Sequence, residues 1–500
     1  MVRIISRKSD LAIIQAESVG ELLKENVEGE DITYQHKETF GDIDQKTPLK
    51  DLPEIGVFTQ DIRNSLINGE ADIAVHSWKD LPIEIGPETQ IAATIERADM
   101  RDIFFLKKKN VDKIIKEGKL KVLTSSPRRS YNLEPFLKKA LPYPIQEIDF
   151  EDIRGNIPTR LKKLLTGKED GLVVAKAAID RILRGKNLNL ANKVKEILDN
   201  FLWMITPLSL NPCAPGQGAL ALEVSSNRKG IIDMVQKIND NKVFQSVSRE
   251  RDTLSQYGGG CHQKIGVSVE NMKFGNVVTL KGLTDERVVL NERRIEREDL
   301  PEWYKINKDA FYPNDLEKYN LFRRHVIKES IDEVSSLKKK NIWVSRANAV
   351  PDQTKICQSN LLWVSGLKTW FKLSERGFWV NGTADSLGEN MNPGIDHLSE
   401  NKKWVKLTHN DSPKNEFDEK IATYHLKRLN IKEDLSQKTH FYWMSGSAFE
   451  YALERFPTIS DCFHACGPGN TYEIIKKKIK EDKITIFLSY DEVFKNLINN

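Results

Sequence analysis

Short apolar runs alternate with helical patterns through about the first 220 residues of the chain. Apolar runs rich in β-branched residues occur at 71–75, 121–124 and 171–175, and each has the length of a buried strand. The segment 11–24 repeats apolar residues at helical spacing, and Ser9 precedes it as a cap. Strands that alternate with helices predict the α/β class, with doubly wound lobes of parallel strands joined by crossover helices.

The pattern becomes mixed in the next part of the chain. One helix near 243–257 is followed by strands at 265–269 and 277–282, which predicts a small α+β domain. Residues 301–340 are polar and charged, and we expect a linker there with one helix near 321–337.

A second α/β unit is expected from 341 to 500. Two of its segments, 362–377 and 464–480, each predict a strand, a glycine turn and a helix with threonine at its start. Backbone amides at helix starts can hold anions. Ordinary strand-to-helix turns explain the same pattern equally well.

The composition excludes several classes of protein. With 500 residues, 39% hydrophobic and 30% charged, the chain is long enough for about three or four folded domains. A net charge of +4 gives no reason to expect a nucleic-acid partner, and no apolar segment is long enough to span a membrane. The five cysteines are scattered rather than arranged as a disulfide framework, so we expect reduced thiols and a cytoplasmic location.

Cys261 follows three consecutive glycines. Glycines let the backbone approach a ligand closely, so this loop can present a nucleophilic thiol. A flexible turn followed by a buried structural cysteine is the alternative.

Arginines gather at predicted helix starts, in the order Arg7, Arg128, Arg129, Arg154 and Arg160. The second and third open a helix that Ser126 caps, and the last two flank a glycine turn. Guanidinium groups bind carboxylates in a planar, bidentate way. Each pair alone is more often a surface salt-bridge donor, but together they favour a site for a polycarboxylate.

Asp80 follows the predicted strand 71–75, at the edge where open α/β sheets bind ligands. A carboxylate among arginines stays ionised and can stabilise a developing cation or move a proton. A helix cap or an ion pair with Lys79 is the alternative.

Cys462, His464 and Cys466 alternate along a predicted strand. Alternate strand residues lie about 6.5 Å apart along a line, so they cannot converge on one ion at bond lengths of about 2.1 to 2.3 Å. We predict no metal site there and expect buried strand positions.

Six motifs together resemble the porphobilinogen deaminase (hydroxymethylbilane synthase) family. In the family's order they are residues 7–12, 72–82, 124–129, 154–160, 214–220 and 259–261. The resemblance covers about residues 1–300 and implies two doubly wound lobes similar to periplasmic binding proteins, then a small α+β domain with the cofactor cysteine. The implied segments are 1–97 with 198–222, 98–197, and 223–300.

This resemblance also implies a dipyrromethane cofactor attached to Cys261 through a thioether. Four porphobilinogen molecules would be condensed with loss of ammonia, and water would release hydroxymethylbilane. Asp80 falls on the family's catalytic aspartate and would stabilise developing positive charge. Cofactor contacts would come from Ser77, Lys79, Ser126, Arg128, Arg129 and Arg154. Substrate contacts would come from Arg7, Arg160 and Gln217.

Three positions depart from the family pattern. Asp10 stands where proline is common, Gln60 stands where lysine is frequent, and the loop at Glu54 lacks the usual lysine. The last two changes remove positive charge from an active-site loop, so they bear on rate or chain binding rather than on the chemistry.

Residues 341–500 resemble the uroporphyrinogen-III synthase family through the segments 343–346, 442–448 and 466–471. The unit is shorter than usual and its 467–471 turn is one residue longer. The resemblance implies two α/β lobes that enclose hydroxymethylbilane and close it, with inversion of the last ring, to uroporphyrinogen III. Candidate contacts are Ser345, Tyr442, Ser445, Ser447 and Thr471. A non-catalytic appendage is the alternative.

The sequence therefore predicts a transferase followed by a lyase of tetrapyrrole and heme biosynthesis, in one multifunctional chain. We expect small molecules as its only partners, porphobilinogen and hydroxymethylbilane, and a monomeric protein. A two-lobed anion-binding protein is the rival interpretation. The lack of an export signal and the presence of Cys261 disfavour it.

Overall fold

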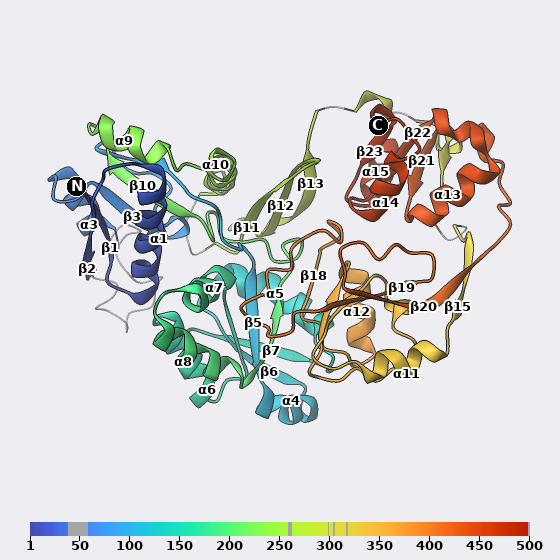
Figure 1. Cartoon of the computed structure of the whole chain (residues 1–500), viewed down its shortest axis with the longest axis horizontal. Helices are drawn as coiled ribbons and strands as arrows, with labels where there is room; N and C mark the ends of the chain where they lie inside the picture. The colour runs from blue at the N-terminus through green and yellow to red at the C-terminus, as the bar shows by residue number, and fades with distance from the viewer. Residues whose placement is uncertain (39–58, 259–262, 299, 304–305, 317–318, 499–500) are drawn as a thin grey trace. The chain divides into compact units, whose positions relative to one another are not determined.

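The computed structural model describes residues 1–38, 59–258, 263–298, 300–303, 306–316 and 319–498. The chain forms two compact units (Figure 1). The first comprises Met1–Met272 and Val277–Arg293, and the second comprises Lys273–Asn276 and Arg294–Asn500. Each unit has its own sheets and hydrophobic cores, so each can be understood separately.

The first lobe of unit one is a five-stranded sheet in the order β2-β1-β3-β10-β4. Its elements are β1 (Val2–Arg7), α1 (Asp10–Asn26), β2 (Ile32–Lys37), α3 (Gln60–Ile67), β3 (Ile73–Ser77), β4 (Thr89–Ala93), β10 (Leu220–Ser225) and α9 (Lys229–Gln236). As predicted, the hydroxyl of Ser9 caps α1, accepting the Ala12 amide at 3.4 Å. The buried face of α1 packs on the sheet through Ala16, Val19 and Leu23.

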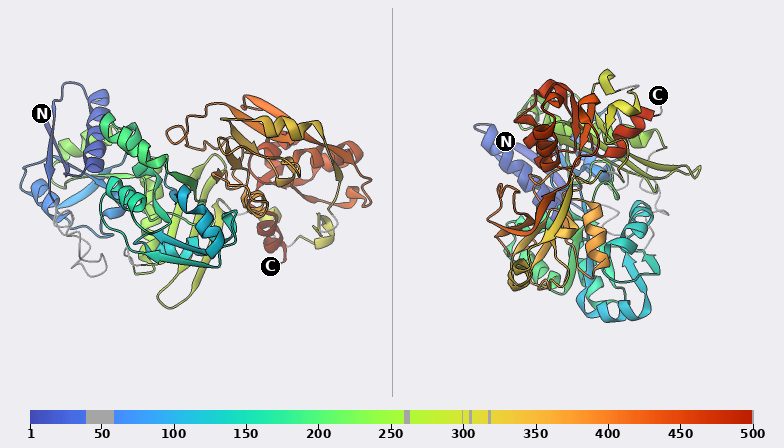
Figure 2. Two further views of the ribbon diagram at one scale, coloured as in Figure 1. Left: turned by 90° about the horizontal axis from the view of Figure 1, so that it is seen from below. Right: turned by 90° about the vertical axis from the view of Figure 1, so that its right-hand side faces the viewer.

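The second lobe is a five-stranded sheet in the order β7-β6-β8-β5-β9. Its elements are β5 (Asp102–Lys107), α4 (Val111–Glu117), β6 (Lys119–Leu123), α5 (Pro127–Ala140), β7 (Glu147–Glu151), α6 (Ile157–Thr166), β8 (Gly171–Ala175), α7 (Lys176–Arg184), α8 (Leu188–Leu198) and β9 (Phe201–Ile205). Figure 2 shows the dark blue α1 beside green helices of this lobe, where it contacts α7.

The mixed α/β class is as predicted, but the sheets are not wholly parallel. In the first lobe β10 runs antiparallel to β3 and β4, and in the second β5 runs antiparallel to β8 and β9. Both strands follow segments that pass from one sheet to the other, residues 94–101 and 206–219, which contain no crossover helix. A strand can run parallel to a neighbour that directly precedes it in the chain only if a crossover connection joins them. The apolar pattern of a strand does not indicate whether such a connection is present.

Two elements lie outside the segments predicted for them. β9 was expected in the first lobe, with 198–222, but it pairs with β5 in the second. α9 was expected in the third domain, but Val235 of this helix joins the core of the first lobe. A strand or helix joins the sheet whose elements it pairs with or packs against. Its own sequence pattern does not indicate which elements these are.

The remaining part of unit one is the predicted small α+β domain. It contains α10 (Asn241–Ser255) and a sheet of β11 (Gly266–Met272), β12 (Gly275–Leu283) and β13 (Val289–Glu296). Leu254 of α10 packs against Val267 and Leu280 of the sheet.

Unit two contains two sheets, in the orders β15-β20-β19-β16-β17-β18 and β14-β21-β22-β23. Its elements are β14 (Phe311–Tyr312), β15 (Phe322–Val326), α11 (Glu329–Ser336), β16 (Asn341–Val344), β17 (Leu361–Val364), α12 (Leu367–Glu375), β18 (Gly382–Thr383), β19 (Trp404–His409), β20 (Glu419–Arg428), β21 (His440–Trp443), α13 (Gly446–Arg455), β22 (Phe463–Cys466), α14 (Asn470–Lys476), β23 (Ile484–Ile486) and α15 (Tyr490–Ile498).

Residues 301–340 differ from the expected linker. Their strand β14 pairs with β21, and β15 pairs antiparallel with β20, so they belong to the same compact unit as 341–500. The chain first forms β14 of the four-stranded sheet and then enters the six-stranded sheet at β15. It leaves that sheet after β20 and returns to the four-stranded sheet. Polar composition concealed β15, which is an exposed edge strand. The other strand, β14, is only two residues long and is too short for a sequence pattern to indicate.

Glu250 of α10 joins the third domain to both connecting segments. Its carboxylate is fully buried and accepts hydrogen bonds from both terminal nitrogens of Arg97, each at 2.8 Å. It also accepts the backbone amides of Gly216, at 2.8 Å, and Val269, at 2.9 Å. One side chain thus holds two connecting segments and a strand of the third domain.

Replacing Glu250 with glutamine should destabilise unit one by about 3 to 5 kcal/mol, because Arg97 would keep a buried charge without its counter-ion. Urea denaturation of the full chain would measure the change. Glu25→Gln, an exposed position on α1, is the matched control and should change the unfolding free energy by less than about 0.5 kcal/mol. Equal urea midpoints for the two variants would contradict this role of Glu250.

Candidate functional site

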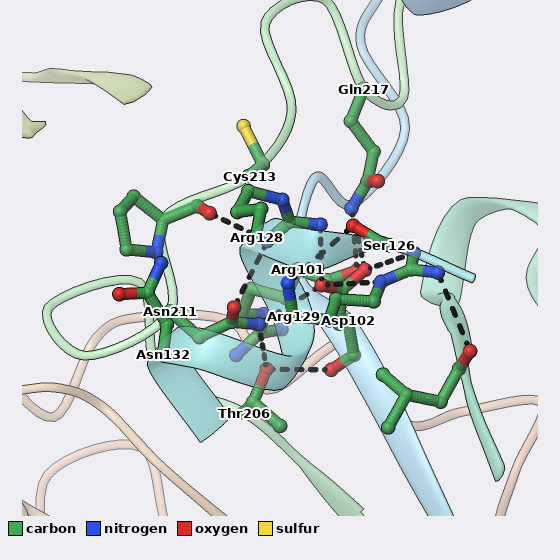
Figure 3. Close-up of polar contacts among 12 residues, drawn as sticks. Arg101, Asp102, Ser126, Arg128, Arg129, Asn132, Thr206, Asn211, Cys213 and Gln217 are labelled. Carbon is green, nitrogen blue, oxygen red and sulfur yellow. Dashed lines mark hydrogen bonds and ion pairs between the residues drawn. The ribbon is translucent and has the colours of Figure 1, made fainter. Parts of the chain in front are cut away.

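A buried carboxylate, Asp102, binds both predicted arginines of α5 (Figure 3). It is the first residue of β5 and is 1% exposed. Arg129 makes a bidentate pair, with Nη2–Oδ1 2.6 Å and Nε–Oδ2 3.1 Å, and Arg128 Nη2 lies 2.9 Å from Oδ2. The two guanidinium groups outweigh the effect of burial and hold the pKa of Asp102 far below its usual range.

The connecting segment 206–219 completes this cluster. Asn211 Nδ2 and Gln217 Nε2 each donate to Asp102 at 2.9 Å. Arg128 in turn donates to Asn211 Oδ1 at 3.0 Å and to the Pro212 carbonyl at 2.7 Å. The predicted residue Gln217 therefore lies in the cluster, and its amide oxygen accepts from Lys79 Nζ at 3.4 Å.

The start of α5 explains why its arginines are placed there. Ser126 is the N-cap, and its hydroxyl accepts the Arg129 amide at 3.4 Å. Pro127 occupies the first turn, where its missing N–H has no cost. The predicted cap therefore orients both arginine side chains toward β5.

Lys79 and Asp80 lie on a short 3-10 helix, Trp78–Asp80, directly after β3. Asp80 is exposed. Burial lowers the pKa of Lys79; Asp80 opposes this shift, and the positive charge of Arg129 adds to it. Ser77 forms a hydrogen bond with Gln15 of α1, at 2.9 Å, which fixes the end of β3.

The second arginine pair approaches the same region. Arg160 Nε donates to the Gly155 carbonyl at 2.7 Å. Burial and the nearby charges of Arg129 and Arg154 together lower the pKa of Arg160 to about 10, against the opposing effect of Asp80. These residues therefore share one electrostatic environment. Arg7 ends β1, and because β1 and β3 are parallel neighbours, Arg7 lies at the same sheet edge as Ser77.

Positive charge exceeds negative charge in this cluster. Its cations are Lys79, Arg128, Arg129, Arg154 and Arg160. The described carboxylates facing them in these interactions are Asp80 and Asp102. An excess of buried or half-buried cations is costly unless anions neutralise it, so the site fits a ligand that carries several carboxylates.

Asp102 and Asn211 are site residues that the sequence did not reveal. Asp102 stands at the start of an apolar strand, where an isolated acid predicts nothing specific. The useful signal was indirect: two adjacent arginines at a buried helix start require a buried anion.

Several predicted positions lie elsewhere. Cys261 and Glu54 fall outside the described residues, so the cofactor cysteine stays a prediction. Gln60 is the first residue of α3, and Asp10 is the first residue of α1.

The candidates in unit two lie mainly at helix starts. Ser445 caps α13, accepting the Ala448 amide at 3.3 Å, and Ser447 and Thr471 lie in first turns of α13 and α14. Ser345 directly follows β16, and its hydroxyl oxygen is buried without a hydrogen-bond partner among the described residues. Tyr442 is 5% exposed in a hydrophobic core beside Tyr490, a position that does not favour a ligand contact.

The described residues contain no cluster of histidine, cysteine and acidic side chains that could hold a metal ion. His464 is fully buried; its Nδ1 accepts from Trp443 Nε1 and its Nε2 donates to the Ile459 carbonyl, each at 2.9 Å. No helix in the described part of the chain is long and apolar enough to cross a membrane. The cytoplasmic location and the monomeric state stay predictions.

The fold and the cationic cluster define unit one as a two-lobed α/β protein with an excess of cations near the end of β3. Residues 2–233 match the family model described as the dipyrromethane cofactor-binding domain of porphobilinogen deaminase. The chain belongs to the porphobilinogen deaminase family.

Three relatives illustrate the similarity. The porphobilinogen deaminase of Caldicellulosiruptor saccharolyticus is 37% identical over 268 residues, which are 53% of this chain and 83% of the relative. That of Campylobacter hominis is 32% identical, covering 62% of this chain and 94% of the relative. The probable porphobilinogen deaminase of Picrophilus torridus is 33% identical, and the match covers 59% of this chain and 95% of the relative.

Asp102→Asn should destabilise unit one by about 3 to 5 kcal/mol at neutral pH, because two buried arginines lose their shared counter-ion. The pKa of Asp102 is depressed in the folded state, so its contribution is present above the unfolded value, about 3.9, and is lost as pH falls below it. The difference between wild type and variant should therefore shrink below about pH 4.

A series of urea titrations at different pH values measures this difference. Asp149→Asn, on the exposed face of β7, is the control and should follow the wild-type curve. A stability difference that persists unchanged to low pH would show that the charge of Asp102 is not the cause.

Proposed function

We propose that unit one condenses four porphobilinogen molecules, with loss of ammonia, to hydroxymethylbilane. The observation that carries the proposal is the excess of cations around Asp80 in a member of the deaminase family. Porphobilinogen bears acetate and propionate groups, so a growing chain of pyrroles is a line of carboxylates. Arginines at several helix starts provide planar binding groups for such a chain.

The cation cluster also fits the family's dipyrromethane cofactor, which carries carboxylates of its own. Lys79, Arg128, Arg129 and Arg154, with the Ser126 hydroxyl, would hold it. When bound through Cys261, the cofactor supplies the pyrrole carbon to which the first substrate is joined. Ser77 would contribute indirectly, because its hydrogen bond to Gln15 fixes the strand end that carries Lys79.

Asp80 is the residue that we place at the reacting atoms. It is an exposed carboxylate within the electrostatic reach of Lys79 and Arg160. It would stabilise the positive charge that develops on a substrate pyrrole as ammonia leaves. Arg7, Arg160 and Gln217 would orient the substrate carboxylates around it, Gln217 by fixing the Lys79 ammonium.

Asp80→Ala should keep the covalent dipyrromethane and reduce turnover by about 10²- to 10³-fold, because a preorganised charge is removed without loss of the binding cations. Intact mass and the rate of porphobilinogen consumption measure the two effects. Asp149→Ala is the control and should retain wild-type turnover. Undiminished product formation by Asp80→Ala would remove Asp80 from the mechanism.

Cys261→Ser should abolish the mass adduct and the activity together, because a serine hydroxyl stays un-ionised at neutral pH and is a far poorer nucleophile than a cysteine thiolate. The bare chain mass in wild-type protein that consumes porphobilinogen would contradict the attachment. A bare mass in protein that binds but does not consume porphobilinogen would favour the rival anion-binding interpretation.

For unit two, we propose cyclisation of hydroxymethylbilane to uroporphyrinogen III. The proposal is supported by an arginine that links the two sheets of this unit. Arg346 lies shortly after β16, and Met444 directly follows β21. The Nη2 atom of Arg346 donates a hydrogen bond to the Met444 carbonyl at 3.0 Å. Strand carboxyl ends from both sheets therefore meet there, as expected of a site enclosed by two α/β lobes.

The charge around Arg346 also suits a substrate with many carboxylates. His409 ends β19. Burial, opposed by Asp411 and assisted by the charges of Arg346, Lys420 and Lys406, lowers its pKa to about 4. His409 is therefore neutral at physiological pH and adds no charge of its own. Lys406 is already paired with Glu389 at 2.8 Å, so Arg346 and Lys420 would be the cations for substrate carboxylates. Ser345, Ser445, Ser447 and Thr471 would add hydroxyl contacts at the same strand ends.

The full chain supplied with porphobilinogen should give mainly isomer III, and Arg346→Gln should slow enzymatic closure about tenfold or more and raise the fraction of isomer I. Chromatography of the oxidised porphyrins separates the isomers. Arg455→Gln, exposed at the end of α13, is the control and should preserve the wild-type ratio. Isomer I alone from the wild-type chain would make unit two non-catalytic.

A further inference from the structure

A separate cavity of about 480 Å³ lies between α5 and the β12–β13 pair of unit one. We call it the α5 cavity; the lining residues used below are Tyr131, Asn132, Pro135, Lys281, Val289 and Leu290. Its volume is within the range of small-molecule sites, about 300 to 1,000 Å³. None of these residues belongs to either proposed catalytic site.

Lys281 brings an uncompensated positive charge to the cavity. The residue is half-buried, and burial alone lowers the pKa of its ammonium group. No carboxylate in the described part of the chain forms an ion pair with it. A desolvated ammonium group is stabilised by an anion, so the cavity favours a negatively charged occupant.

Asn132 adds a buried acceptor. Its side chain is 2% exposed, and its Nδ2 donates to the Lys281 carbonyl at 3.5 Å, which fixes the direction of the amide. Its Oδ1 is buried and has no hydrogen-bond partner among the described residues. Such an acceptor costs about 1 to 3 kcal/mol, a cost that a ligand with an N–H or O–H donor would remove.

The other lining groups are both polar and apolar. Glu134 and Lys138 of α5 form an ion pair at 2.8 Å, so these two charges offset each other and leave Lys281 as the excess charge. Tyr131 and Pro135 come from α5, and Val289 and Leu290 come from β13. Val289 is 66% exposed, which is high for an apolar residue at a cavity. A ligand with an apolar ring would cover part of this surface and gain from its burial.

We propose that the α5 cavity binds a small organic anion: an apolar ring with a carboxylate for Lys281 and a hydroxyl or amine donor for Asn132. The occupant would lie against the helix whose first turn holds Arg128 and Arg129. The proposal depends on neither catalytic activity, so it can fail or hold independently of them.

The test uses 4-hydroxybenzoate as the probe and the full chain as the protein. Titration calorimetry and saturation-transfer NMR should detect binding to wild type. Lys281→Met should weaken it about tenfold or more, because a charged hydrogen bond is lost, while Lys281→Arg retains it. Lys237→Met, an exposed position after α9, is the matched control and should bind as wild type does.

A second variant tests the acceptor. Wild type should prefer 4-hydroxybenzoate to benzoate, and Asn132→Leu should erase that preference. Asp80→Ala should bind the probe normally, because its site is separate. The proposal is overturned by absence of binding to wild type at millimolar concentration, or by equal binding of the probe to wild type and to Lys281→Met.

Discussion

The shared binding of Arg128 and Arg129 by the buried carboxylate of Asp102 is the constraint on which the site depends. Two adjacent guanidinium groups repel each other and are costly to bury, so neither would keep its place without this acid. One carboxylate against two cations also leaves the pair with a net positive charge. The same interaction therefore fixes the arginines and preserves their attraction for an anion.

Asp102 also couples the site to the arrangement of the first unit. It begins β5, immediately after one connecting segment, and it accepts hydrogen bonds from Asn211 and Gln217 on the other. Gln217 then contacts Lys79 after β3. A displacement of one lobe relative to the other would strain these hydrogen bonds, so cation positions and lobe arrangement change together.

The sequence predicted the local elements well and their partners less well. The cap at Ser9, the helix start at Ser126 and the strand at 171–175 depend on neighbours in sequence, which a pattern records. The direction of β5 and β10 depends on distant strands, and the apolar pattern is the same for either direction. The family resemblance placed Arg128, Arg129 and Gln217 near one ligand, but the acid that joins them had no local signal.

The two units illustrate different uses of the same sheet geometry. In unit one, cations from α5 and α6 approach the end of β3 and are held by buried partners. In unit two, Arg346 is exposed and bridges strand ends through a single backbone carbonyl. A bridge of one hydrogen bond is weak enough to open and re-form. Such a contact suits the cyclisation that we propose for unit two, in which a long flexible substrate would enter and its ends would be brought together, whereas a chain grown on a fixed anchor needs cations that do not move.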